Sequence, residues 1–143
     1  MVDIFNMKDF QNNEDKGSKM YGNTAHNIYA QNNVGVESPA KLVEMLYEGV
    51  LRFNAQAKKA IKDKDVAKRV YWTNRSTAII TELIAILDMT QGEISEYLEG
   101  LYNYEIQLLA EAGNENNIAK LDECSNVFKT LLEAWRESVD VAY

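Results

Sequence analysis

From residue 38 onward, apolar residues recur every three or four positions along four long segments. This spacing gathers side chains on one face of an α-helix. Ser38 and Pro39 precede the first segment. Proline suits the first helical position and serine accepts hydrogen bonds from the first turn, so we predict a helix from there to about residue 62. Its apolar positions are Leu42, Met45, Leu46, Val50, Phe53, Ala57 and Ile61.

The second segment, which starts near Asp65, is apolar over more than one face. One row of inward positions is Val66, Val70, Thr73, Thr77, Ile80, Ile84 and Leu87. A second row beside it is Trp72, Ile79, Leu83 and Ile86. A single neighbouring helix covers only one such face, so the sequence predicts that something further packs against this helix.

Two further helices are expected after residue 89. Residues 90–93 have the spacing of a capping box, and Gly113 is a residue that commonly ends a helix. The third apolar row is Ile94, Tyr97, Leu98, Leu101, Tyr104, Leu108 and Ala112. The fourth segment, from about residue 117 to 141, turns inward Ile118, Leu121, Cys124, Phe128, Leu131, Trp135 and Val139.

The connections between these segments are short, which makes successive helices antiparallel neighbours. With 46% apolar residues, seven glycines and one proline, the 143-residue chain has material for one core and few helix breakers. The predicted fold is therefore all-α: residues 38–143 form an antiparallel up-down four-helix bundle, preceded by a short helical or irregular cap.

The segments before residue 38 differ in composition. Residues 1–19 are polar and contain a Gly-Ser pair just before Met20, which predicts an added tag or a disordered tail. Residues 20–37 are rich in asparagine and aromatic residues. Their apolar side chains are too few to form a core alone, so we expect them to lie against the bundle as a cap or to stay loose. They are Ile28, Tyr29 and Val34.

Charge and composition exclude several kinds of partner and compartment. The formal charge of −7 repels phosphate backbones, which argues against nucleic acid. No stretch approaches the roughly 20 apolar residues of a membrane-spanning helix, so no membrane insertion is expected. The single Cys124 cannot form an internal disulfide, and no secretory signal opens the chain. A soluble cytoplasmic protein is predicted.

The sequence offers no constellation of catalytic residues. A di-iron bundle site needs histidines on inward faces, whereas the only histidine is His26, before the bundle. Glu44, Glu48 and Glu82 fall on or near polar faces, which predicts solvated carboxylates. Cys124 falls on an inward face, which predicts an inert buried thiol. We therefore expect neither an enzyme nor a cofactor, and look instead to a protein-binding surface.

The start of the first predicted helix resembles the signature of the FliS family of flagellin-specific export chaperones. Residues 81–83, 87–88, 100–102 and 131–136 agree with the family as well, and the resemblance extends from about residue 20 to 141. The residues that carry the signature are Ser38, Pro39, Leu42, Met45, Leu46, Tyr47 and Gly49.

This resemblance implies a helical bundle that binds the disordered C-terminal region of flagellin in the cytoplasm. Binding would prevent premature polymerisation and aid delivery to the flagellar type III export apparatus, with the export gate and a co-chaperone as further partners. It also implies that the segment around 21–34 covers part of the binding surface when flagellin is absent. The candidate groove residues, taken from spare apolar positions, are Leu51, Tyr71, Trp72, Ile79, Leu83 and Ile86.

A different class of function is compatible with the same apolar surface. The chain would then be a structural or regulatory bundle whose apolar faces pair with a second copy of itself. The two hypotheses differ in their partner. If the apolar surface is used for self-association, the chain forms a stable dimer whose mass does not fall when flagellin peptide is added.

Overall fold

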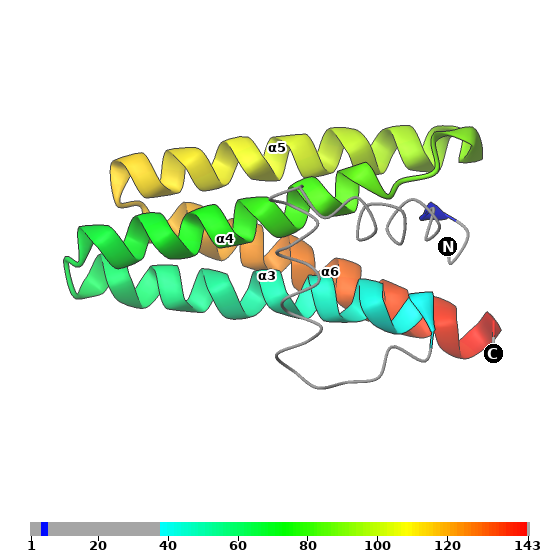
Figure 1. The fold of residues 1–143 in the computed structure, drawn as a ribbon, viewed down its shortest axis with the longest axis horizontal. Coiled ribbons are helices and arrows are strands. Elements are labelled where there is room, and N and C mark those ends of the chain that lie inside the picture. Colours follow the sequence, from blue (N-terminus) through cyan, green and yellow to red (C-terminus); the bar gives the residue numbers. More distant parts are fainter. Residues whose placement is uncertain (1–3, 6–37, 143) are drawn as a thin grey trace, which may run out of the picture.

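The computed structural model describes residues 4, 5 and 38–142, with side-chain surroundings up to residue 139. It contains α3 (Pro39–Lys62), α4 (Val66–Ala85), the 3-10 turn η2 (Met89–Gln91), α5 (Glu93–Glu115) and α6 (Ile118–Ala142). The four helices alternate in direction (Figure 1), and each packs along two neighbours, in the circular order α3, α4, α5, α6. The predicted all-α, antiparallel four-helix bundle is confirmed. The predicted cap lies outside the described residues.

Local capping explains where the first two helices begin. Ser38 has extended backbone, and its hydroxyl accepts a hydrogen bond from the Lys41 backbone N–H at 3.3 Å, with Pro39 at the first helical position. The carboxylate of Asp65 accepts from the Lys68 N–H at 3.0 Å at the start of α4. Both starts agree with the sequence prediction because both signals are local.

The junction between α4 and α5 differs from the predicted capping box. Asp88 is the residue that organises this turn: its carboxylate accepts from the Thr90 backbone N–H at 3.0 Å and from the Thr90 hydroxyl at 2.6 Å. The Ser95 hydroxyl donates to the Asp88 carbonyl at 2.6 Å. Because Thr90 is held by Asp88, Gly92 precedes α5 instead, at φ +75° and without a side-chain cap.

The end of α5 also differs from the prediction. The helix runs through Gly113 to Glu115, and Asn116 adopts the left-handed conformation, with φ 53°. Asparagine tolerates this region better than most residues. The Arg69 Nη1 donates to the Asn116 side-chain carbonyl at 2.7 Å, which holds this turn against the start of α4.

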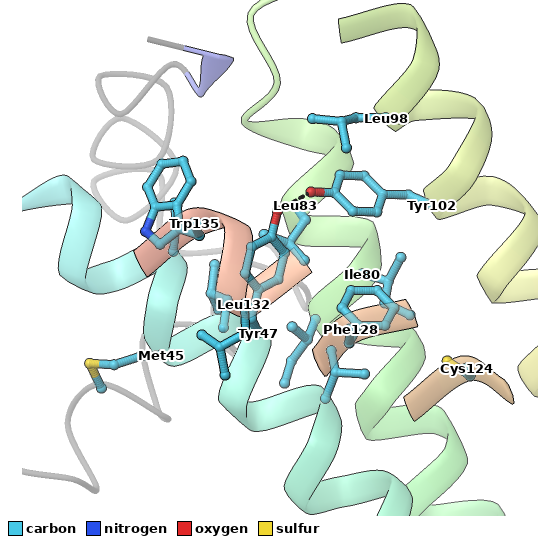
Figure 2. Close-up of a cluster of buried hydrophobic side chains, with 14 of the residues drawn as sticks. Met45, Tyr47, Ile80, Leu83, Leu98, Tyr102, Cys124, Phe128, Leu132 and Trp135 are labelled. Atoms are coloured by element: carbon cyan, nitrogen blue, oxygen red, sulfur yellow. Dashed lines mark hydrogen bonds between the residues drawn. The ribbon is translucent and has the colours of Figure 1, made fainter. Parts of the chain in front are cut away.

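A row of aromatic rings fills one half of the core (Figure 2). The hydroxyls of Tyr47 on α3 and Tyr102 on α5 share a buried hydrogen bond of 2.6 Å. The Phe128 ring lies 5.9 Å from that of Tyr47 and 6.2 Å from that of Tyr102. Next to them, the Trp135 indole N–H donates to the Ala40 carbonyl at 2.8 Å. Burial raises the pKa of Tyr47 to about 12, so its hydroxyl stays protonated.

A small layer of polar groups crosses the middle of the bundle. The Asn54 side-chain carbonyl on α3 accepts from the Ser76 hydroxyl on α4 at 2.7 Å. The Asn54 amide donates to the Ser125 hydroxyl on α6 at 3.2 Å. These directional bonds link three helices at one level, as buried polar groups require.

Some residues assigned to inward rows lie at the surface. Val66 and Val70 of α4, and Ile94, Tyr97 and Tyr104 of α5, are exposed. On α5, Leu98, Leu108 and Ala112 are buried as predicted, but in place of the three exposed residues the core face takes positions one residue further along, roughly 100° round the helix. Its buried residues are Ser95, Leu98, Tyr102, Glu105, Leu108, Leu109 and Ala112.

Ile4 and Phe5 are buried at the end of the bundle where α4 passes into α5. Phe5 pairs with Leu87 as an isolated antiparallel bridge, and the Asp88 N–H donates to the Ile4 carbonyl. The Phe5 ring meets Trp135 edge-on at 5.6 Å. The prediction of an added or disordered tail made no provision for this contact. The rest of that segment lies outside the described residues.

Replacing Phe5 with alanine should lower stability modestly. The ring is buried, but Phe5 belongs to none of the four helices and can detach without opening the bundle, so we expect a loss of about 1 to 2 kcal/mol, below the roughly 3 to 5 typical of a core phenylalanine. Urea unfolding measures this loss. Phe128→Ala is the matched control, and an equal loss in both variants would contradict the view that Phe5 is a detachable contact.

The tyrosine pair should behave non-additively. Tyr47→Phe or Tyr102→Phe alone leaves the other hydroxyl buried without its partner, which costs about 1 to 3 kcal/mol. The double variant removes both hydroxyls and should be less destabilised than the sum of the single variants. Denaturant midpoints of all four proteins form the cycle; strict additivity would show that the hydroxyls do not act as a pair.

Candidate functional site

The first half of α3 is buried on nearly all sides. In its second half only Phe53, Asn54, Ala57 and Ala60 are buried, the pattern of a helix with one covered face. Among the described helices, α3 packs substantially only along α4 and α6. Buried positions in the first half are Ala40, Leu42, Val43, Met45, Leu46, Tyr47, Gly49 and Val50.

The second half of α4 is likewise buried on more sides than its packing against neighbouring helices explains. Ile80 and Leu83 point toward the aromatic rings of the core (Figure 2). Glu82 follows Ile80 by two positions, which at 3.6 residues per turn places it about 200° round the helix, on the opposite side. It is nevertheless only 1% exposed, and Ile79 and Ile86 on its flanks have no exposed surface. This side of α4 is therefore buried although it faces away from the core.

The two over-buried surfaces adjoin. The rings of Phe53 on α3 and Trp72 on α4 lie 5.4 Å apart, and the helices are antiparallel, so Met45 lies level with the region around Ile80. Met45 projects from α3 away from the aromatic rings (Figure 2). We call this surface the α3–α4 outer face. Its residues are Leu42, Met45, Gly49, Ile79, Glu82 and Ile86.

The structure brings together only part of the predicted groove. Ile79 and Ile86 lie on the outer face, and Trp72 continues it, half-buried against Phe53. Tyr71 is 51% exposed and meets the Trp72 ring edge-on at 4.8 Å. These four positions form one continuous side of α4.

Leu83 and Leu51 lie elsewhere. Leu83 points into the core toward Tyr102 (Figure 2) and has no exposed surface. Leu51 precedes Lys58 by two helical turns, and the Lys58 ammonium pairs with Asp122 of α6 at 3.0 Å. Leu51 is therefore on the α6 side of α3. The predicted cap residues Ile28, Tyr29 and Val34 lie outside the described part of the chain.

The prediction that Glu82 is a solvated carboxylate is wrong. Its Oε1 atom is buried and has no hydrogen-bond partner, and burial raises the pKa of the carboxyl group. Glu44 and Glu48 do fit the prediction, since both are partly exposed and accept from Arg136 of α6 at 2.9 and 2.6 Å. Helical periodicity missed Glu82 because this position lies outside the inward row of α4, where a carboxylate is normally solvated.

A second surface feature lies between α5 and α6, on the opposite edge of the bundle from the outer face. It is an open groove of about 420 Å³. Tyr97 and Tyr104 stand beside it, and the Tyr104 hydroxyl donates to Glu123 at 3.4 Å. The lining residues are Tyr97, Leu101, Glu123, Asn126, Val127, Thr130 and Leu131.

The described residues were compared with the requirements of a reactive thiol, a metal site and a membrane-spanning helix. Cys124 is buried, and burial raises the pKa of its thiol, which disfavours the reactive thiolate. Within residues 4, 5 and 38–142 no three histidine, cysteine or acidic side chains gather as a metal site. No helix in this part of the chain is long and apolar enough to cross a membrane.

Comparison with known proteins shows the family of this chain. The family model described as flagellar protein FliS matches residues 21–142. A Campylobacter jejuni protein named flagellar secretion chaperone FliS is 56% identical over 119 residues, covering 82% of this chain and 93% of the relative.

More distant relatives carry the same name. The Salmonella typhimurium protein is 31% identical, over 80% of this chain and 90% of its own length. The Bacillus subtilis protein is 28% identical, over 80% and 85%. Since the family model matches nearly the whole chain from residue 21 onward, this chain belongs to the FliS family of flagellar proteins.

Proposed function

We propose that this chain is a cytoplasmic export chaperone that binds the disordered C-terminal region of flagellin. Binding keeps flagellin from polymerising early and delivers it to the flagellar type III export apparatus. Family membership supports this proposal, and the relatives compared here are named flagellar secretion chaperones. The chain needs no catalytic group for this task.

The observation that carries the proposal is the α3–α4 outer face. It holds more apolar surface than the bundle requires for its own packing, on α3 and α4 together. A disordered ligand loses conformational freedom when it folds on its chaperone, so it needs a preformed apolar surface to offset that loss. An amphipathic helix laid along two parallel ridges is a common way to supply the contact.

The size and residues of the outer face suit such a helix. From Leu42 to Gly49 the face follows α3 for about two turns, roughly 11 Å at 1.5 Å per residue. Gly49 has no side chain and lets a ligand approach the backbone. Met45 is flexible, so it adapts to ligand side chains of different shape. A bound helix would therefore place two or three apolar anchors here, at three- and four-residue spacing.

The segment before α3 acts in this proposal as a competitor. Ile28, Tyr29 and Val34 cover the outer face when flagellin is absent and leave it when flagellin binds. A ligand that must displace a cap binds with an apparent affinity reduced by the fraction of open chain. This competition protects a surface that would otherwise promote aggregation.

The export gate and a co-chaperone are further partners in this proposal. The α5–α6 groove lies on the edge of the bundle opposite α3 and α4. A partner bound there would leave the outer face to flagellin, so both contacts are compatible in one complex.

Binding of a flagellin C-terminal peptide, followed by calorimetry, tests the proposed function. Ile79→Ala removes an anchor contact from the outer face and should weaken binding about tenfold, the effect of losing roughly 1.4 kcal/mol. Ile80→Ala is the matched control, because the same residue type one position later faces the core. It should lower the unfolding midpoint while leaving the affinity of the folded protein within about twofold.

Two outcomes would overturn the proposal. One is the absence of binding heat at tens of micromolar peptide. The other is a stable dimer in light scattering whose mass stays unchanged when peptide is added, which would support self-association instead. Equal affinities of Ile79→Ala and wild type for the peptide would show that the flagellin site does not include Ile79 and lies elsewhere than the outer face.

A further inference from the structure

We infer that Glu82 is a polar recognition residue of the α3–α4 outer face, whose carboxyl group receives a lysine or arginine side chain of the bound helix. This inference rests on the proposed function, because the helix that carries the lysine or arginine belongs to the C-terminal region of flagellin. It adds a chemical requirement to that function: the ligand carries one positive charge among its apolar anchors.

The first observation is that Glu82 is buried without a full set of partners. Only 1% of its surface is exposed, and its Oε1 atom has no hydrogen bond. Most buried polar groups in proteins are paired, and an unpaired carboxyl group is costly. Packing alone would be better served by leucine or methionine at this position. The stability of the fold therefore does not explain a carboxyl group at this position, which points to a role in binding.

The second observation is where Glu82 lies. Ile79 and Ile86 flank it by about one turn on each side, and Met45 lies across from it on α3. The carboxyl group thus stands in the middle of an apolar surface, away from the core. A cation brought to it by a ligand would be shielded from water, where a charge-assisted hydrogen bond is stronger than at an exposed site.

The third observation is that three cations on this side of the described helices have other partners. Arg75 lies over the Phe53 ring at 4.8 Å and donates to the Tyr71 hydroxyl at 2.9 Å. Arg52 lies over the same ring at 5.5 Å, and Lys41 pairs with Glu44 at 3.6 Å. None of these three forms an ion pair with Glu82, so among the described residues none of them competes with a cation from the ligand.

The other buried carboxyl group shows that burial alone is not the criterion. Glu105 on α5 is also 1% exposed, and both of its carboxyl oxygens are buried without a hydrogen bond. It sits beside Cys124 in the packing between α5 and α6, and burial raises its pKa. A ligand helix on the outer face does not reach that position, so Glu105 gives no basis for the same inference.

A double-mutant cycle tests the inference. Each lysine and arginine of the flagellin C-terminal peptide is replaced in turn by norleucine, and affinities are measured for wild type, Glu82→Gln and Glu82→Met. One replacement should weaken binding to wild type about tenfold and change binding to both variants less than threefold. Glu48→Gln is the matched control, since Glu48 lies on the α6 side of α3 and pairs with Arg136. It should behave as wild type with every peptide.

The outcomes separate the inference from the proposed function. If the unmodified peptide fails to bind wild type, the proposed function fails. If it binds and every replacement has the same effect on wild type and on the Glu82 variants, the inference fails while the function stands. Helical circular dichroism of both variants establishes that they fold, and Glu82→Met supplies a second test if Glu82→Gln alone is unstable.

A pH series on stability checks the burial of Glu82 separately. Because burial raises its pKa, the neutral carboxyl is tolerated at low pH, and stability falls as the pH rises through the raised pKa. Glu82→Gln removes this loss. Its melting temperature should exceed that of wild type at pH 8 and equal it near pH 4. A constant difference across the series would show that Glu82 titrates as an exposed carboxyl.

Discussion

The first half of α3 and the second half of α4 pack side by side and form a layer with an inner and an outer side. Only the inner side can pack against the other two helices of the bundle. The inner side packs against α5 and α6 through Tyr47, Ile80 and Leu83. The outer side carries Met45, Ile79 and Ile86, which are just as buried. At about 1.5 to 3 kcal/mol for each fully buried side chain, this side holds on the order of 5 kcal/mol of transfer free energy. That is comparable with the net stability of a small domain, so exposing the outer side to water would cost much of that stability. In the proposed function, a cap and a ligand that exchange on this side would avoid that cost.

Sequence reasoning was strongest for the fold. The helix starts at Pro39 and Val66 follow from Ser38 and Asp65, because a cap involves residues within one turn of each other. Errors arose where several local signals compete. Thr90 fits a capping box, yet its hydroxyl is held by Asp88. Gly113 fits a helix end, yet α5 continues to Glu115 and Asn116 takes the left-handed position.

The candidate site was only partly accessible from sequence. The second apolar row of α4 was found, because two adjacent rows at helical spacing exceed what one neighbour can cover. On α3 the sequence shows only one apolar row, which contains Leu42 and Met45. That pattern does not separate the outer face from the core face, so the sequence marks this surface as a family signature and not as a wall of the site. Glu82 was misplaced for the same reason. A polar residue outside the inward row is normally solvated, and only the three-dimensional arrangement shows that this one is covered.

The polar layer at Asn54 limits how the helices can move relative to one another. Its bonds to Ser76 and Ser125 hold α3, α4 and α6 at one axial level. Sliding one helix by a turn would move its partners about 5.4 Å apart and break them. The helices are therefore locked against axial shear, and shape adjustment falls to lateral spreading and rotamer changes in the half that contains Met45.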